Sequence, residues 1–354
     1  MSSKEPIYRQ AGLPVFQNKA YPTPAAARLA PIGDVELVQC PRSGLVYNAR
    51  FDEALLQYDE HYQNEQACSP SFKRHLEEVR GIVLANIKAG QKGIEIGCGK
   101  GYFLEMLAEA GADVMGYDPA YEGASARVVK QYFGAEAVAE APDYVVLRHV
   151  LEHIASPWSF LQQLAAKCGA GTRIYIEVPC FDWIVENNAF YDVFYEHVNY
   201  FTLDVLRHVF SRVIQSGRLF GGQYLYIVAE LAGFGPPSAY SGREFEKLKL
   251  EDYLSELVAR RKDPGNGFFI WGAGAKGITF ANILARKGLD VAALIDINPA
   301  KQGKYAGLSA ASIVAPESVL DQLGGRDVFV MNPVYLDEIK SMCGETGVNW
   351  ISVV

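Results

Sequence analysis

A cluster of glycines flanked by carboxylates is the first feature of this sequence that could bind a ligand. Gly97, Gly99 and Gly101 follow an apolar run that contains Glu95, and the next apolar run ends at Asp118. Glycines allow a ligand to lie against the backbone, and the amides of a following helix offer hydrogen-bond donors. A carboxylate at the end of the second run can accept both hydroxyls of a ribose. The spacing predicts a nucleoside-binding strand–turn–helix–strand unit, with a purely structural glycine turn as the alternative.

The spacing of these residues also distinguishes between two kinds of cofactor. A dinucleotide-binding turn reads G-x-G-x-x-G, whereas residues 95–101 read E-x-G-x-G-x-G. Together with the aspartate beyond it, this pattern resembles motif I of class I S-adenosylmethionine-dependent methyltransferases. The resemblance implies S-adenosylmethionine as the cofactor, held by Glu95, Gly97, Gly99, Gly101 and Asp118.

Two polar residues follow the next apolar run. Residues 144–147 predict a buried strand, and Arg148 and His149 stand at its carboxyl end, which faces the ligand crevice in an open parallel sheet. Arg148 is therefore a candidate cofactor contact. His149 and His153 have the spacing of a zinc-binding pair, but Glu152 precedes the second histidine instead of following the first, and no third ligand is evident. We therefore expect no metal.

A long connection, residues 179–201, carries the candidate base. Its periodicity is weak, and segments of this kind in compact domains usually have a function. Thr202 is expected to cap the helix that follows, which places Tyr195, Glu196 and His197 just before a helix amino terminus and near the crevice. Histidine titrates near neutrality, so His197 is a candidate general base, with a structural histidine as the alternative.

A second glycine turn begins at residue 272. Gly272 and Gly274 belong to a G-x-G-x-x-G run, and Asp296 follows Gly272 by twenty-four residues, a pattern that on its own predicts a nicotinamide cofactor. The unit ends about ninety residues after it begins and shows no acid or base suited to hydride transfer. It is better suited to hold the phosphates or ribose of a substrate. Lys276 and Lys304 are candidate charge partners for such phosphates, with solvated surface lysines as the alternative for each.

Four segments together resemble the nucleotide-sugar C-methyltransferases of deoxysugar biosynthesis: EIGCGKGYFL, RHVLEHI, YEHVNYF and NPAKQGKY. The resemblance covers about residues 35–354. It implies an amino-terminal zinc domain, a methyltransferase core, and a carboxy-terminal Rossmann-like domain that helps to hold the nucleotide diphosphate. The implied reaction methylates a carbon beside the 4-keto group of a dTDP-sugar through an enolate. His197 would be the base, Glu196 would orient it, and Tyr195 and His149 would polarise the keto oxygen.

The chain departs from that family at two places. Cys40 is the one zinc ligand that remains, so the amino-terminal zinc domain is degenerate, and Phe194 stands where the family usually has a tyrosine. A different acceptor, such as an oxygen or nitrogen nucleophile, is therefore an alternative. Tyr62 lies in the segment that often covers the cofactor in methyltransferases, which makes it a candidate cofactor contact with an ordinary surface or core tyrosine as the alternative.

The order of these units predicts an α/β protein: a class I methyltransferase (Rossmann-like) domain followed by a second, smaller Rossmann-like α/β domain. We expect a degenerate flap with a hairpin over residues 1–70, the methyltransferase domain over 71–235, a linker helix over 236–265, and the second domain over 266–354. Within the core, residues 124–132 predict a helix and residues 135–138 a short strand.

Composition limits the classes of partner. The formal net charge of −8 over 354 residues argues against nucleic acid, which requires a basic face. No apolar run is long enough to span a bilayer and no signal peptide is evident, so we expect a cytoplasmic protein without a membrane partner. The six cysteines form no C-x-x-C pair and are expected to be reduced. A small-molecule acceptor remains, with the oligomeric state left open, and a nicotinamide-dependent enzyme and a non-catalytic binding protein are the alternatives.

Overall fold

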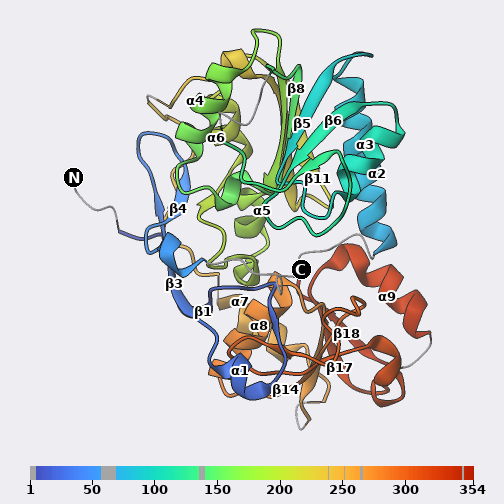
Figure 1. Cartoon of the computed structure of the whole chain (residues 1–354). Coiled ribbons are helices and arrows are strands. Elements are labelled where there is room, and N and C mark those ends of the chain that lie inside the picture. The colour runs from blue at the N-terminus through green and yellow to red at the C-terminus, as the bar shows by residue number, and fades with distance from the viewer. Residues whose placement is uncertain are drawn as a thin grey trace.

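The structure is a computed structural model that describes residues 5–56, 69–134, 140–237, 239–250, 252–263, 266–344 and 347–354. Figure 1 shows two α/β units, one above the other, with the amino-terminal segment running along one side of both. Each unit is built on a sheet in which one of the inner strands is followed by one of the two glycine turns.

The first unit contains a seven-stranded sheet of order β11-β12-β9-β8-β5-β6-β7. Its inner strands are near-continuous apolar runs, as expected for parallel strands that are covered on both faces. The two last strands along the chain, β11 and β12, are antiparallel, and β12 is also antiparallel to β9. The strands are β5 (Lys92–Ile96), β6 (Asp113–Tyr117), β7 (Val128–Val129), β8 (Tyr144–Arg148), β9 (Arg173–Pro179), β11 (Val213–Leu219) and β12 (Tyr224–Glu230).

Helices cover both faces of this sheet (Figure 1). Helix α2 begins after the capping Ser69 and buries one apolar face, as its periodicity predicts. Thr202 caps α6 as expected, since its side chain accepts a hydrogen bond from the Val205 amide. The helices of this unit are α2 (Pro70–Ala85), α3 (Tyr102–Glu109), α4 (Pro157–Lys167), α5 (Phe181–Glu186) and α6 (Leu203–His208).

One local prediction for this unit differs from the structure, and a second falls on residues that the structure does not describe. The predicted helix over residues 124–132 is wrong: this stretch contains the edge strand β7, which pairs with β6. The predicted strand over 135–138 lies outside the described residues.

The connection 179–201 contains α5, the 3-10 turn η3 (Phe190–Asp192) and β10 (Asn199–Tyr200), because its many aromatic side chains are buried against the core.

The second unit contains a parallel five-stranded sheet of order β16-β14-β13-β17-β18. Its strand–glycine turn–helix–strand start is as predicted, and the chain therefore has the expected α/β fold class with two Rossmann-like units. The linker helix is shorter than predicted. The elements are α7 (Asp252–Ala259), β13 (Phe268–Trp271), α8 (Ala275–Arg286), β14 (Val291–Ile295), β15 (Tyr305–Ala306), β16 (Ile313–Val314), β17 (Asp327–Val330), α9 (Leu336–Cys343) and β18 (Asn349–Ser352).

The amino-terminal segment contacts both units. Strands β1 (Tyr8–Pro14), β3 (Ile32–Gln39) and β4 (Val46–Asn48) form a sheet with β10 of the first unit, and β3 and β4 are the predicted hairpin. Strand β2 (Ala20–Tyr21) pairs instead with β15 of the second unit. Helix α1 (Pro24–Arg28) lies between these pairings. None of the helices in the described part of the chain has the length and apolar character needed to span a bilayer.

Short 3-10 turns complete the described structure. They are η1 (Glu53–Leu55), η2 (Leu151–His153), η4 (Leu231–Gly233), η5 (Pro316–Ser318), η6 (Leu320–Gln322) and η7 (Pro333–Tyr335). Turn η2 matters most for function, because it directly follows β8 and its residues reach the space between the two units.

Candidate active site

A cavity of about 420 Å³ lies between the two units, and both glycine turns open onto it. This follows from topology, since the carboxyl ends of parallel strands face the ligand crevice in open α/β sheets. Ten of the sequence-predicted site residues line the cavity: Glu95, Gly97, Gly99, Arg148, His149, Glu196, His197, Gly272, Gly274 and Lys276.

Three glycines in the left-handed backbone region and one carboxylate shape the first glycine turn. Gly97, Gly99 and Gly101 have φ values of +73°, +55° and +79°, a region that favours glycine. Asp118 accepts hydrogen bonds from the amides of Gly99 and Ala120, each 2.8 Å long. Burial raises the pKa of Asp118, although these two hydrogen bonds oppose the change. The predicted contacts Asp118 and Gly101 are not among the described residues that line the cavity.

Glu95 brings a buried carboxyl group to the same turn. It lies in β5, is 2% exposed and lines the cavity. Its Oε2 has no hydrogen-bond partner among the residues that the structure describes. Burial raises the pKa of Glu95 to about 7, while the nearby Arg148 guanidinium acts in the opposite direction. Near neutral pH this group can therefore exist in either protonation state.

Glu177, in β9, organises a buried polar cluster that the sequence argument missed. Its carboxylate lies 3.1 Å from Nε2 of His75, 3.0 Å from Nε2 of His149 and 3.3 Å from the Arg148 guanidinium. The Tyr175 hydroxyl donates a hydrogen bond of 2.6 Å to it. Burial alone would raise the pKa of Glu177, but the cationic neighbours outweigh it and hold that pKa well below the usual value. The sequence feature that could have revealed this cluster is a glutamate near the carboxyl end of an otherwise apolar strand.

His149 lies between two carboxylates. Its Nε2 faces Glu177, and its Nδ1 lies 3.4 Å from Oε1 of Glu152 in η2. The backbone has φ +53°, unusual for a residue other than glycine, and the ring packs edge-on against Tyr224. Burial would lower the pKa of His149, but the two carboxylates outweigh it and raise the pKa to about 9. His149 is therefore a cation at neutral pH.

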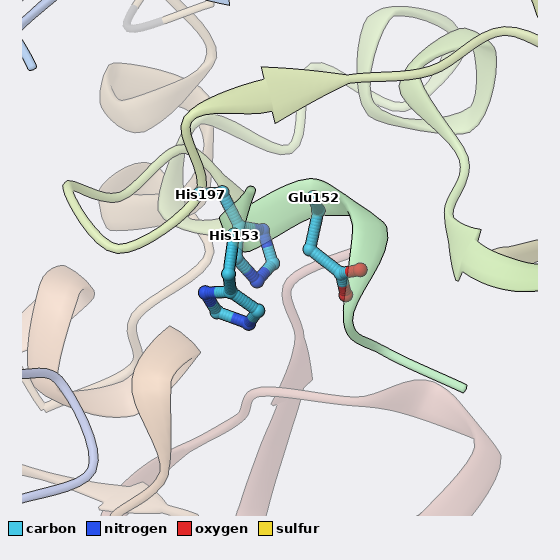
Figure 2. A group of neighbouring side chains, drawn as sticks. All are labelled: Glu152, His153 and His197. Atoms are coloured by element: carbon cyan, nitrogen blue, oxygen red, sulfur yellow. The ribbon is translucent and has the colours of Figure 1, made fainter. Parts of the chain in front are cut away.

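His197 has the opposite charge state. It is 8% exposed, and its ring contacts those of Phe194 and His153, with centroids 4.1 and 4.9 Å away. Burial, reinforced by the positive charges of His149 and Lys276 and by His153, holds the pKa of His197 well below its usual value. The imidazole is neutral at neutral pH and has a lone pair available. Figure 2 shows His197 beside Glu152 and His153 on the cavity wall.

The two residues before His197 differ from the predicted roles. Tyr195 was expected to polarise a keto oxygen, but it points away from the cavity, and its hydroxyl donates to the Asp52 carbonyl and accepts from the Asp52 amide. The absence of a side chain at Gly33 leaves room for its ring. The Glu196 carboxylate accepts a 2.9 Å hydrogen bond from the Gln17 amide of the amino-terminal segment. Its backbone carbonyl accepts from Nδ1 of His153.

Of the two predicted lysines of the second unit, Lys276 lines the cavity and Lys304 does not. Lys304 lies next to β15, which pairs with β2, and it is not among the described residues that line the cavity. Lys301 lines the cavity instead, because the preceding turn directs its Nζ to within 3.2 Å of the Ala273 carbonyl. Lys276 also faces the cavity and forms a 2.8 Å ion pair with Asp192 of the first unit. The predicted contact Tyr62 lies outside the described residues.

Comparison with known proteins shows which class of enzyme this chain is. Residues 58–213, which include the first glycine turn and His197, match a family model described as a methyltransferase domain. The chain is an S-adenosylmethionine-dependent methyltransferase. This methyltransferase is 26% identical over 304 residues to C-methyltransferase NovU of Streptomyces niveus, an alignment that covers 73% of this chain and 70% of NovU. The predicted enzyme class and cofactor are confirmed.

Two solved structures match about half of this chain. One is N-methyltransferase NodS from Bradyrhizobium japonicum in complex with S-adenosyl-L-homocysteine. Its TM-score is 0.36 at 16% sequence identity, and the match covers 49% of this chain and 92% of the NodS chain. Another is the PH0226 protein from Pyrococcus horikoshii. Its TM-score is 0.38 at 14% sequence identity, and the match covers 49% of this chain and 99% of the PH0226 chain. At these scores the likeness adds nothing to the fold assignment, which rests on the strand order.

The residues around the first glycine turn fit S-adenosylmethionine. A Cβ on Gly99 would meet nothing within 4 Å, so the turn leaves room for a ligand to approach. The buried Oε2 of Glu95 suits an ammonium group, and the adjacent Arg148 guanidinium suits a carboxylate. The Asp118 oxygens keep second lone pairs that could accept ribose hydroxyls. These individual contacts remain predictions.

Proposed function

We propose that this methyltransferase transfers the methyl group to a carbon of a keto-sugar nucleotide, or of a similar enolisable small molecule, with His197 as the general base. The observation that carries the proposal is the presence of a neutral His197 and a cationic His149 in one cavity. Groups whose surroundings push their pKa values apart are suited to divide base and acid roles. The similarity to a C-methyltransferase supports transfer to carbon.

S-adenosylmethionine, when bound, supplies a methyl group already activated by its sulfonium. The protein therefore mainly needs to align the acceptor and remove one proton. His197 would take the proton from the carbon beside the carbonyl group. The positive charge of His149 would polarise the carbonyl oxygen as that oxygen gains negative charge, and His197, which is 8% exposed, would act in a largely water-free part of the cavity. Glu152 and Glu177 would keep His149 charged for this role.

The second unit would hold the nucleotide part of the acceptor. Gly272 and Gly274 lie at the cavity and lead into α8, whose first amides are hydrogen-bond donors for an anion. Lys276 and Lys301 add positive charge at the same end of the cavity. A diphosphate bound at this end would lie across the cavity from the first glycine turn, and the sugar would then lie between the two units.

Methyl transfer from cofactor labelled with ¹³C in its methyl group tests this function. The purified enzyme would be incubated with a dTDP-4-keto-6-deoxy sugar, and the product examined by ¹³C nuclear magnetic resonance. A labelled methyl carbon bonded to a ring carbon beside the carbonyl is the expected result. A methoxy product, or no transfer to any keto-sugar nucleotide, would contradict the proposal.

A further inference from the structure

Three side chains that could bind a metal ion meet on the wall of the cavity. Glu152 and His153 leave the same turn, η2, and His197 approaches from the loop before β10 (Figure 2). One ligand atom from each side chain lies within 4.8 Å of the other two. The sequence argument considered His149 with His153, whereas the structure groups His153 with Glu152 and with His197, which is distant along the chain and reaches η2 only through the fold.

Glu152 is a buried carboxylate whose hydrogen-bonding capacity is not satisfied. Its side chain is fully buried, and within the described part of the chain neither of its oxygens has a hydrogen-bond donor. The nearest charged group, the His149 imidazole, lies 3.4 Å from Oε1, which is too long for a close hydrogen bond. A buried carboxylate without hydrogen bonds is costly, and a bound metal ion removes that cost.

The two histidines present imidazole nitrogens to the same space. Nδ1 of His153 lies 2.8 Å from the backbone carbonyl of Glu196, so this nitrogen carries the proton and donates it. The lone pair is then on Nε2. A hydrogen bond of this kind, from the second ring nitrogen to a carbonyl, is the arrangement that orients metal-binding histidines. The rings of His153 and His197 lie edge to face.

We propose that Glu152, His153 and His197 bind a divalent transition-metal ion of the Zn²⁺ type. Two imidazoles and one carboxylate suit such an ion and leave coordination positions open towards the cavity. Ligand atoms around tetrahedral zinc lie about 3.4 Å apart, so side-chain rotations must bring the three ligands closer than in this structure. The residues around them line the cavity, which gives the ion a route of entry.

The proposed ion has a consequence for methyl transfer, and this part rests on the proposed function. One lone pair of His197 cannot both coordinate a metal and take a proton from the acceptor. Occupation of the site would therefore inhibit the enzyme, and a chelator would restore its activity. The ion would act as a reversible inhibitor that competes with the base.

Binding of Co²⁺, used as a spectroscopic probe for a zinc-type site, tests the proposal without methyl transfer. Tag-free, chelator-treated full-length enzyme should bind one equivalent with visible absorption bands. Glu152→Gln and His153→Gln should weaken binding by more than about 100-fold. The control His208→Gln should bind as the wild type does, because His208 is exposed on α6 and lies against Tyr240 away from the cavity. Circular dichroism checks that each variant is folded.

Three results would overturn the proposal or its consequence. The metal site is refuted if Co²⁺ shows no saturable binding, or if folded Glu152→Gln and His153→Gln bind it unchanged. The competition is wrong if Zn²⁺ binds and methyl transfer continues at its full rate. Failure of the proposed function would look different, since the metal-free enzyme would then not methylate a keto-sugar nucleotide although Co²⁺ still bound.

Discussion

At the scale of residues, the buried ion pairs decide which charges the cavity can hold. Glu177 is a single interior carboxylate that faces Arg148, His149 and His75. If it were removed, buried positive charge would remain without compensation, which is far more costly than the loss of an exposed pair. The charge state of His149, and with it the proposed stabilisation of an oxyanion, therefore depends on Glu177 in a different strand.

The variant Glu177→Gln should be destabilised by about 3–5 kcal/mol, because it leaves buried cations unpaired. Urea denaturation followed by circular dichroism measures the change in the free energy of unfolding. Glu186→Gln is the matched control, since Glu186 pairs with Arg218 at the surface and such a pair contributes about 0–1 kcal/mol. Equal losses in the two variants would show that the interior cluster has no special role.

Glu95 should make cofactor binding depend on pH. Its pKa is raised to about 7, so the carboxyl group is neutral below that pH and an anion above it. An anion attracts the ammonium group of the cofactor, and affinity for S-adenosylhomocysteine should therefore rise between about pH 6 and about pH 8. Calorimetric titrations should show this rise in the wild type and in the exposed control Glu109→Gln. A rise of equal size in Glu95→Gln would rule out this assignment.

At the scale of elements, the sequence was sufficient where local pattern decides structure. The glycine turns, the strand that ends at Arg148, the cap at Thr202 and the hairpin within residues 35–48 follow from spacing and turn chemistry. It was insufficient where a side chain's direction depends on distant packing. Tyr195 and Glu196 lie in a turn, and only the packing of the Tyr195 ring at Gly33 and its hydrogen bonds to Asp52 direct it away from the cavity.

The same reason explains the other differences. Lys301 and Lys304 are three residues apart in one polar stretch, and only the folded chain distinguishes them, since Lys301 lines the cavity and Lys304 lies next to β15, which pairs with β2. The strand β7 is only two residues long and exists because it pairs with β6, so no periodicity could reveal it. The Glu177 cluster joins a helix and two strands that are far apart in the sequence.

Gly277 should tolerate no side chain. It is the third glycine of the second turn, and a Cβ there would lie 1.7 Å from the backbone oxygen of Gly272. Because backbone cannot move aside as a side chain can, Gly277→Ala should lose about 3 kcal/mol of stability, the upper end for overpacking. Gly81→Ala in α2 is the matched control: nothing lies within 4 Å, and helix propensity predicts a gain of up to about 1 kcal/mol.

The free energy of unfolding from urea titrations measures both variants. If Gly277→Ala is as stable as the wild type, the close contact between the helix and the glycine turn does not exist in solution. If Gly81→Ala is strongly destabilised, the assignment of residue 81 to an exposed helical position is wrong.

At the scale of the whole molecule, buried polar contacts hold the two units around the cavity. Gln223 of the first unit and Asn332 of the second exchange two side-chain hydrogen bonds of 2.8 and 3.0 Å. Lys276 donates to Gln223 and pairs with Asp192. The amino-terminal segment adds strand pairings on both sides. These contacts place the two glycine turns opposite each other, which the proposed binding of cofactor and acceptor requires.

Gln223→Ala should therefore weaken the association of the units. It leaves Asn332 and Lys276 short of a buried partner, at a cost of about 1–3 kcal/mol. Differential scanning calorimetry should show a lower or broader transition than in the wild type. Gln322→Ala, on the surface of the second unit, is the control and should change nothing. An unchanged transition in Gln223→Ala would mean that these hydrogen bonds do not connect the units in solution.

The central claim is that His197 removes a proton from a carbon of the acceptor, and proton exchange measures that step without methyl transfer. The enzyme, S-adenosylhomocysteine and a dTDP-4-keto-6-deoxy sugar would be incubated in deuterium oxide and followed by proton nuclear magnetic resonance. The wild type and His208→Gln should introduce deuterium at the carbon beside the carbonyl, and His197→Gln should do so at least about 100-fold more slowly while binding S-adenosylhomocysteine normally. Exchange at the wild-type rate in His197→Gln, or none in the wild type, would contradict the account.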